Sequence, residues 1–535
     1  MSRAGPALTL AVLGALVLVT AAQYGPVRWT NFGGADEWLL LDLNGRGIVA
    51  MPHANRPLNL LWSLPGPLLT PYRFEGYRLA YLGYLAATGF LTWLLARRLA
   101  PEQPVAAFTA GALAIGWAPL DMARLSIVQM LPNLAVTACW LACLLLLLRL
   151  RDDGRPVWFV AAVLLATLAA RSYEAVLGLL LGAPPVVWLS APGSRRPRRL
   201  GWLVAWEAAV AILAALAAWP LVHGDGSSLY QSAVVRADFD PLRYLSGLAR
   251  QYWYHLAPLV PRDPSELTPA VLVPAAAFLA GAALVLCGRG TGASGGRRGL
   301  LLLAGVGLVL AGMGYSVLLL GASVQGPSRM QFLAAPGIAL FLAMAIGLAA
   351  SFLPGPRLGV ALALALGATV VAVGAGHTRG MQREWDRTTF YPRQRDCLAA
   401  LVRQAPALRA GSLLLLIDED GTWPFAFTFR HAGRLVYGDG VTAHALGSRQ
   451  LLYSATADAA GIRVSPWRIV QGPWHERPTE HRYDQVVVFR LSGGALSRLD
   501  TWPQTQLGAL PAGARYAPAE SITDAPAPPG RRVLD

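Results

Sequence analysis

Long apolar runs alternate with short polar connections along the first two thirds of the chain. Because about 20 apolar residues in helical conformation cross a bilayer core, this pattern predicts a polytopic α-helical membrane protein. The first run follows Arg3, so a cleavable signal peptide is an alternative interpretation of it. The runs 157–171 and 174–192 are separated by a tight charged turn and could form one broken or re-entrant unit. We count eleven candidate spans: 6–23, 77–96, 104–120, 128–148, 157–171, 174–192, 201–222, 269–287, 299–321, 330–352 and 358–376.

The pattern changes after the last of these runs. Charges become mixed, Pro and Gly are scattered, and no membrane-length apolar run remains. A helix is predicted near 394–406, and buried strands at 412–417, 433–437 and 485–490. The expected domains are a transmembrane domain over 1–376 with loops 24–76 and 223–268, a small α/β domain over 377–516, and a Pro- and Ala-rich disordered tail over 517–535.

The composition supports a membrane location. Hydrophobic residues make up 55% of the 535 residues and charged residues only 14%, whereas soluble domains carry about 25% charged residues. The formal charge is +15, and all 45 basic residues are Arg. These Arg lie in short clusters between apolar runs, which indicates a bilayer partner and no nucleic acid. The four Cys give neither a disulfide framework nor a metal-ligand spacing.

The Arg distribution predicts the orientation. With the N-terminus inside, the cytoplasmic segments hold fourteen Arg, and the short turns on the other side hold only three: Arg124, Arg171 and Arg329. The positive-inside rule therefore places loops 24–76 and 223–268 and the C-terminal domain outside the membrane. The absence of Lys is typical of a high-GC bacterial genome, so we expect the bacterial cytoplasmic membrane.

Polar side chains collect in the connections predicted to be extracytoplasmic. An acidic pair, Asp36-Glu37, could act as general base on a hydroxyl acceptor. Guanidinium groups in the same connections could hold a phosphate, because their geometry matches its oxygens. Solvated headgroup contacts are the alternative role for each. The candidates are Asp36, Glu37 and Asp121 for catalysis and Arg56, Arg124, Arg171, Glu174, Arg243 and Arg329 for substrate binding; His53 and His255 are expected at the interface.

Several of these residues resemble motifs of the GT-C superfamily of integral-membrane glycosyltransferases, which includes protein O-mannosyltransferases and aminoarabinose transferases. The matching pieces lie at the starts of loops and spans, and a hydrophilic C-terminal domain also fits. They are Asp36-Glu37, Asn55-Arg56-Pro57-Leu58, Ser172-Tyr173-Glu174 followed by Pro184-Pro185, and Pro327-Ser328-Arg329 followed by Pro336-Gly337.

The resemblance implies an enzyme that moves a sugar from a polyprenyl-phosphate carrier to a lipid, glycan or protein acceptor on the extracytoplasmic face. The usual catalytic aspartate of the family corresponds to Asp36, with Glu37 as the fallback, and Asp121 could be a second carboxylate. A base opposite the leaving phosphate favours inversion at the anomeric carbon. Some relatives use a divalent metal, but no cluster in this sequence requires one, so no cofactor is predicted.

Two other functions remain open. The chain could be a transporter or flippase of a lipid-linked glycan, or a non-catalytic protein of cell-envelope assembly. A carrier is expected to show midplane carboxylates or broken helix pairs, which are weakly represented here. The Asp418-Glu419-Asp420 cluster is expected in a solvated turn, with cation binding as its alternative.

Overall fold

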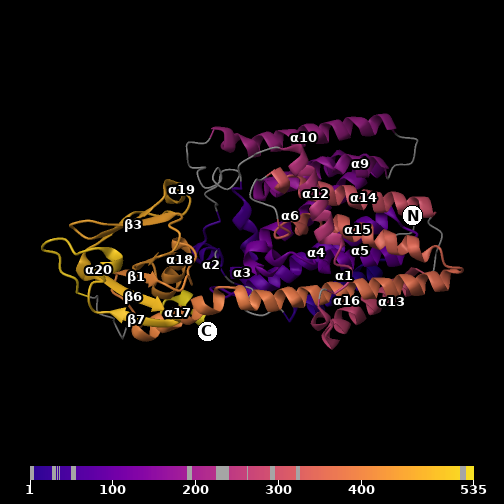
Figure 1. Cartoon of the computed structure of the whole chain (residues 1–535). Coiled ribbons are helices and arrows are strands. Elements are labelled where there is room, and N and C mark those ends of the chain that lie inside the picture. Colours follow the sequence, from indigo (N-terminus) through magenta and orange to yellow (C-terminus); the bar gives the residue numbers. More distant parts are fainter. Residues whose placement is uncertain are drawn as a thin grey trace. The chain divides into compact units, whose positions relative to one another are not determined.

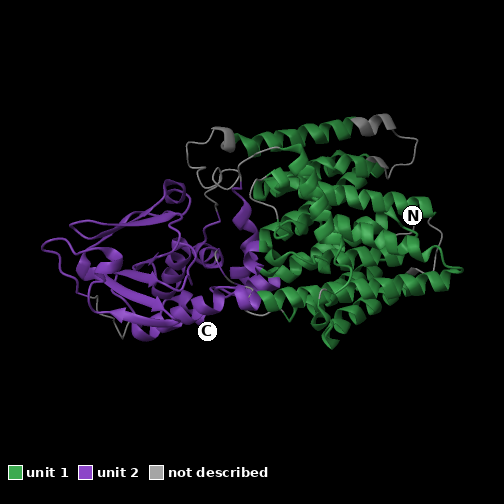
Figure 2. Cartoon of the chain, in the orientation of Figure 1, with its two compact units in different colours: residues 1–27, 80–125, 130–384 green, residues 28–79, 126–129, 385–535 purple. Residues whose placement is uncertain are grey.

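The computed structural model describes residues 5–26, 32, 34, 36–49, 56–189, 196–223, 240–261, 263–289, 296–320, 326–517 and 526–535. The chain divides into two compact units, coloured separately in Figure 2. Unit 1 comprises residues 1–27, 80–125 and 130–384, and unit 2 comprises residues 28–79, 126–129 and 385–535. The chain passes from one unit to the other within the helices α4, α6 and α16.

Each of the eleven predicted spans has a helical counterpart. In the described part of the chain, eight helices are long and apolar enough to cross a membrane, and three shorter apolar helices cover 104–116, 156–172 and 174–187. Ten of the predicted spans correspond to single helices: α1 (Pro6–Tyr24), α4 (Glu75–Leu99), α5 (Pro104–Gly116), α6 (Ile127–Asp153), α7 (Pro156–Ser172), α10 (Arg196–His223), α13 (Leu272–Arg289), α14 (Arg297–Ser316), α15 (Gln331–Ala350) and α16 (Pro356–Thr388) (Figure 1).

The run predicted at 174–192 is broken into three short pieces. They are η4 (Glu174–Val176), α8 (Leu177–Leu181) and α9 (Ala183–Leu189). Gly182 separates the last two, and Pro184 and Pro185 follow it. Proline has no N–H to donate to the preceding turn, so the helix cannot run through this point unchanged.

Small residues set the packing of the helical unit. The helix α14 packs against α15, α5 packs against α15, and α1 packs against α13 and α5. A Cβ on Gly337 of α15 would lie 2.5 Å from the backbone nitrogen of Ala311 on α14. Only glycine permits this approach of two backbones, which is how helices commonly associate in membranes. Because α1 is part of this packing, the structure places it in the bundle.

Further elements occupy the connections of unit 1. The amphipathic helix α12 covers Pro241–Leu256. Its start is capped by Asp240, whose side chain accepts hydrogen bonds from the backbone N–H groups of Leu242 and Arg243, as N-cap aspartates do. Short 3-10 turns complete the connections: η3 (Met122–Leu125), η5 (Pro264–Glu266), η6 (Pro269–Val271) and η7 (Leu318–Leu320).

Unit 2 is built on two small sheets. The four-stranded sheet has the order β2-β1-β6-β7, in which β1 runs parallel to β2 and β6 and β7 is antiparallel to β6. The three-stranded sheet, β3-β4-β5, is antiparallel. The strands are β1 (Leu413–Asp418), β2 (Thr442–Leu446), β3 (Tyr453–Ala457), β4 (Ile462–Pro466), β5 (Thr479–His481), β6 (Val486–Ser492) and β7 (Ala495–Leu499).

Helices complete unit 2. The helix α18 (Ala426–Tyr437) connects β1 to β2 and packs against β2. Every residue of β1 is buried, so both faces of this strand are covered. Such two-sided burial explains the continuous apolar run Leu413–Ile417. The other helical elements are α2 (Glu37–Gly45), η2 (Asn59–Ser63), α3 (Pro65–Leu69), α17 (Tyr391–Gln404), α19 (Arg468–Gln471), η8 (Tyr483–Gln485), α20 (Gln504–Leu507) and η9 (Pro529–Leu534).

The structure corrects three expectations. Residues 433–437 belong to α18 and form no strand, because a five-residue apolar run does not distinguish a buried helix from a strand. Residues 526–535 of the expected disordered tail include η9, where Arg531 donates hydrogen bonds to the carbonyls of Val436 and Pro406. Most of the loop predicted at 24–76 of the transmembrane domain belongs to unit 2, which also contains residues 385–535.

Candidate active site

The acidic pair lies at the start of α2, and its two carboxylates have different surroundings. Glu37 is 2% exposed, and its Oε1 accepts a hydrogen bond from Ser126 Oγ at 2.5 Å while Oε2 accepts one from the Gly34 N–H at 3.1 Å. Asp36 occupies the N-cap position without capping the helix, is only half-buried, and accepts a hydrogen bond from Gln129 Nε2 at 2.7 Å. Glu37 is therefore held on both oxygens, whereas Asp36 retains access to solvent.

The loop that carries this pair is fastened by Gln394 of α17. The Gln394 side chain is fully buried and accepts a hydrogen bond from Trp38 Nε1 at 2.8 Å. Its Nε2 donates to the carbonyls of Gly34 and Thr422, at 3.0 Å each. Trp38 also stacks on Tyr391, with ring centroids 5.8 Å apart. The residues on both sides of Asp36 are thus held by a single amide group.

Asp121 lies in unit 1 and is fully buried. Its Oδ1 accepts a hydrogen bond from the backbone N–H of Arg329 at 2.7 Å. Its Oδ2 has no hydrogen-bond partner among the described residues. Burial raises the pKa of Asp121, and the hydrogen bond from Arg329 and the charge of Arg124 only partly oppose this effect. This geometry is that of a buried carboxylate with one oxygen available for a further donor.

Arg124 follows Asp121 but points to the end of a helix. It is 1% exposed, and its Nη1 donates to the Ile115 carbonyl at 2.9 Å and to Tyr24 Oη at 3.2 Å. Its Nη2 donates to the Ala114 carbonyl at 3.4 Å. The last carbonyls of a helix carry partial negative charge, which a guanidinium stabilises. In this structure Arg124 caps α5, and the predicted role in phosphate binding does not match its contacts.

The other candidate arginines have more exposed positions. Arg329 is exposed and has a left-handed backbone conformation, with φ of 62°. Arg171 lies in the last turn of α7, where its Nη1 donates to the Leu216 carbonyl at 3.4 Å, and Glu174 begins η4. Arg243 lies in the first turn of α12, and Arg56 precedes η2. Of these arginines, Arg329 also contacts another candidate residue, because its backbone N–H donates to Asp121.

Several connections of unit 1 meet at one place. Trp117 Nε1 donates to the carbonyl of His255 at 2.9 Å, and Tyr173 contacts Phe332 edge-on at a centroid distance of 5.9 Å. The first of these contacts joins the turn before α6 to the end of α12, and the second joins the turn before η4 to α15. The contact between Asp121 and Arg329 joins the turn before α6 to the turn before α15. His255, expected at the interface, is fully buried, and its Nδ1 lies 2.6 Å from Tyr315 Oη.

The candidate residues fall into two sets. Asp36, Glu37 and Arg56 belong to unit 2, and Asp121, Arg124, Arg171, Glu174, Arg243 and Arg329 belong to unit 1. Within unit 1 the structure brings Asp121, Arg124 and Arg329 together. His53 and Asn55 lie outside the described residues.

Sequence reasoning missed the partners of the acidic pair. Ser126 and Gln129 stand at the start of the apolar run 128–148, where two polar residues ahead of a span were a usable signal. Gln394 had no such signal, because a glutamine in an amphipathic helix is ordinary. Its importance depends on contacts with residues more than 300 positions earlier in the chain.

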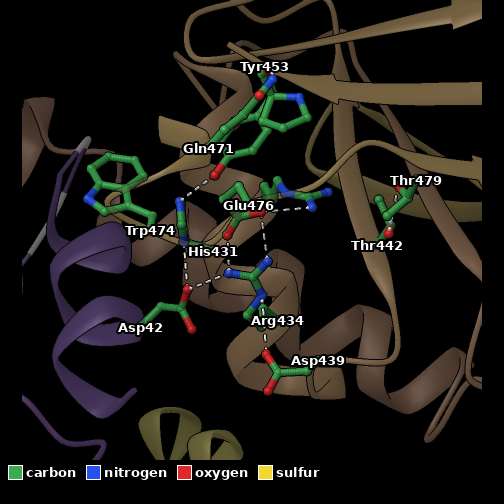
Figure 3. A network of polar contacts seen from close by, with 12 residues as sticks. Asp42, His431, Arg434, Asp439, Thr442, Tyr453, Gln471, Trp474, Glu476 and Thr479 are labelled. Atoms are coloured by element: carbon green, nitrogen blue, oxygen red, sulfur yellow. Dashed lines mark hydrogen bonds and ion pairs between the residues drawn. The ribbon is translucent and has the colours of Figure 1, made fainter. Parts of the chain in front are cut away.

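A second missed feature is a buried ion network that includes Asp42 on α2 (Figure 3). Asp42 Oδ2 lies 2.6 Å from His431 Nδ1 and accepts a hydrogen bond from Arg434 Nη1 at 3.2 Å. Arg434 forms a bidentate pair with Glu476, at 2.7 and 3.1 Å. Arg46, just after α2, contacts the same Glu476 at 3.3 Å. A lone acid within the apolar stretch Trp38–Leu43 was the available signal.

The neighbouring arginine charges determine whether the carboxylates of this network are ionised. Burial alone would raise the pKa of Glu476, but the hydrogen bond and the charge of Arg434, with the charge of Arg430, hold that pKa well below its usual range. Both carboxylates therefore stay ionised at neutral pH. An ion network of this kind is strongly destabilised when one partner is removed, because a charge then stays buried without its counterion.

The acidic cluster after β1 forms a turn, but its first residue is buried and engaged. Asp418 accepts hydrogen bonds from the backbone N–H groups of Thr422 and Trp423, at 3.1 and 2.6 Å. Asp420 accepts from the N–H groups of Gly493 and Gly494. No group of three or more His, Cys, Asp or Glu in the described chain could hold a metal ion. The prediction that no metal is required stays a prediction.

Comparison with known proteins finds similarity among solved structures. No family model and no curated protein matches this sequence. Among solved structures, the chain is similar to ArnT from Cupriavidus metallidurans bound to undecaprenyl phosphate, with 13% identity, a TM-score of 0.36, and coverage of 78% of this chain and 83% of that chain. The membrane-length apolar helices of unit 1 and the sheets of unit 2 agree with the predicted polytopic helical membrane protein with a C-terminal α/β domain.

Proposed function

We propose that this chain is a membrane glycosyltransferase. It transfers a sugar from a polyprenyl-phosphate-linked donor to a lipid, glycan or protein acceptor on the extracytoplasmic face of the bacterial cytoplasmic membrane. The observation that carries the proposal is the acidic pair at the start of α2, in which one carboxylate is fixed and the other is accessible. The Arg distribution supports an orientation that places this pair outside.

Asp36 is the base of the proposed reaction. A general base must come within about 3 Å of the acceptor proton, which a half-buried carboxylate can do. Glu37 is buried, with hydrogen bonds on both oxygens, so it holds the loop in place. In the proposed step, Asp36 accepts the acceptor's hydroxyl proton as the acceptor oxygen attacks the anomeric carbon, and the bond to the phosphate oxygen breaks with its electron pair.

Arginines stabilise the leaving group in this proposal. The polyprenyl phosphate gains negative charge as the sugar departs, and preorganised cations at that position lower the barrier. Arg329 is the first candidate, with Arg171 and Arg243 as further ones, because their side chains are at least partly exposed. Attack from the face opposite the phosphate predicts inversion at the anomeric carbon.

The experiment compares D36N with E37Q and with a control, E102Q, which changes an exposed acid outside the site. Full-length proteins in lipid nanodiscs are assayed with polyprenyl-phosphate mannose, glucose, arabinose and aminoarabinose. Loss of a general base is expected to lower kcat by about 10²- to 10⁴-fold in D36N. Unfolding temperature and undecaprenyl phosphate binding are measured in parallel.

Each outcome is informative. Loss of transfer in D36N, with normal unfolding temperature and lipid binding, supports Asp36 as the base. Full transfer by D36N overturns that assignment. If wild-type protein transfers no sugar but moves lipid-linked glycan across vesicles, the transporter function replaces the transferase.

A further inference from the structure

Gln394 occupies an unusual position relative to the acidic pair. It lies in the first turns of α17, in the C-terminal part of the chain, yet its amide is the shared hydrogen-bond partner of residues 34, 38 and 422. A buried primary amide offers two donors and an acceptor. In Gln394 both donors and the acceptor are engaged, with distances of 2.8 to 3.0 Å.

The contacts of Gln394 bracket Asp36 in the sequence. Gly34 is two residues before Asp36, and Trp38 is two residues after it. Gly34 also donates its N–H to Glu37 at 3.1 Å, so the carbonyl side of Gly34 is held by Gln394 and the N–H side by the acidic pair. The Gly34 carbonyl before Asp36 and the Trp38 indole after it are both held by Gln394, and this restricts where the Asp36 side chain can point.

The turn after β1, which Gln394 also contacts, is itself held by hydrogen bonds. The third partner of Gln394 is the carbonyl of Thr422, in the turn after β1, and that turn is held by the buried Asp418 carboxylate through two backbone N–H groups. The strand β1 is fully buried. A continuous path of hydrogen bonds therefore runs from the central strand of the α/β domain through Gln394 to the loop of Asp36.

The rest of α2 is held by the same domain. Asp42 contacts His431 and Arg434 of α18 (Figure 3). Arg46 donates to the carbonyl of Trp474 at 2.9 Å. These contacts lie one and two helical turns beyond Glu37. The helix that carries the acidic pair is thus fastened at its start, middle and end by side chains or backbone of the C-terminal domain.

We infer that Gln394 is a positioning residue for Asp36, and that the C-terminal α/β domain orients the acidic pair for catalysis. This inference rests on the proposed function for the role of Asp36, but the fastening of α2 can be tested independently of activity. Holding a base within a narrow range of positions has a large effect on rate, because small misplacements of reacting groups are costly.

The test uses full-length Q394L, Q394E and a matched control, Q404L. Gln404 lies on the same helix, is exposed, and donates to the Leu496 carbonyl away from the acidic pair. Two readouts are taken: steady-state transfer with the donor that the wild type uses, and hydrogen exchange of peptides covering 34–45, with β1 peptides as reference. Q404L is expected to match the wild type in both.

Q394L removes all three hydrogen bonds. We expect kcat to fall at least tenfold, with the donor KM within twofold, and exchange in 34–45 to accelerate while β1 stays protected. Q394E keeps the acceptor for Trp38 but loses the amide donors, and protonation of the introduced carboxyl returns one donor. Its kcat relative to the wild type should therefore rise as the pH is lowered, a trend that a merely structural change would not produce.

The outcomes separate the two proposals. Unchanged exchange and unchanged kcat in Q394L overturn the positioning role. Faster exchange in Q394L together with full transfer by D36N retains the fastening of α2 but overturns Asp36 as the base. A loss of β1 protection in both Q394L and Q394E, equal to that in 34–45, shows a general folding role and overturns positioning.

Discussion

Single residues of one chemical type have different roles in this protein. Asp36 and Glu37 are neighbours in sequence, yet one side chain is half-buried and the other has hydrogen bonds on both oxygens. Arg124 and Arg329 show the same contrast, since Arg124 is buried at the end of α5 and Arg329 is exposed. Residue type and spacing in the sequence do not distinguish these roles. The burial of each side chain in the folded protein does.

Arg329 yields a prediction at this scale. Its φ of 62° is unfavourable for a residue with a Cβ by about 1–2 kcal/mol and costs glycine little. We expect R329G to keep or raise the unfolding temperature while weakening undecaprenyl phosphate binding at least fivefold. Titration and thermal unfolding of purified protein measure both. The control R357Q removes an exposed Arg elsewhere, and equal weakening by R357Q would contradict a specific phosphate contact.

Individual helices depend on side chains from distant elements. The helix α5 has only 13 residues, and its last carbonyls receive the guanidinium of Arg124 from the following connection. Such a short helix gains stability from capping and packing more than from its own hydrogen bonds. The helix α2, with nine residues, likewise depends on Gln394, His431 and Arg434.

The capping of α5 can be tested with R124M and R124K. Hydrogen bonds to a charged group contribute about 1.5–3 kcal/mol each, so R124M should be destabilised by about 2–4 kcal/mol. R124K keeps the charge but not the fork of donors, so we expect an intermediate loss. Urea unfolding followed by tryptophan fluorescence gives the values. An R124M protein as stable as the wild type would show that the capping contacts contribute nothing.

At the scale of the molecule, the two compact units respond to different conditions. The helical unit depends on apolar packing, and unit 2 additionally contains the buried network around Glu476. The folded-state pKa of Glu476 lies below its unfolded value. Its stabilising effect is therefore fully present above the unfolded pKa, near 4.3, and is lost as the pH falls through the lower folded value.

We expect E476Q to lower the stability of unit 2 at pH 7 by about 3–5 kcal/mol, because Arg430 and Arg434 lose the Glu476 charge and Arg434 keeps only its other acidic partners. The difference between wild type and E476Q should shrink as the pH is lowered below about 4. Hydrogen exchange of β1 and α18 peptides across this pH range measures it. A difference independent of pH would exclude the ionised carboxylate as its source. E480Q, at an exposed acid on β5, is the control.

The sequence predicted the fold better than the site. The apolar runs anticipated the helices α1, α4 to α10 and α13 to α16, and the runs near 412–417 and 485–490 anticipated β1 and β6. The strand predicted at 433–437 was wrong, because a short apolar run is compatible with both a strand and a buried helix. For the site, the sequence singled out the acidic pair, whose role stays a prediction, but it gave no signal for the contacts of Gln394 and Asp42, since their partners are hundreds of residues away.

The sequence by itself determined the membrane architecture. In hydrocarbon every backbone polar group must be satisfied within its own segment, so runs of apolar residues become helices whatever their neighbours. Tertiary structure alone decided that residues 28–79 join the C-terminal domain, that Glu37 is buried while Asp36 is accessible, and that Arg124 caps a helix. Those outcomes depend on side-chain hydrogen bonds between residues brought together only by folding, and no local pattern records them.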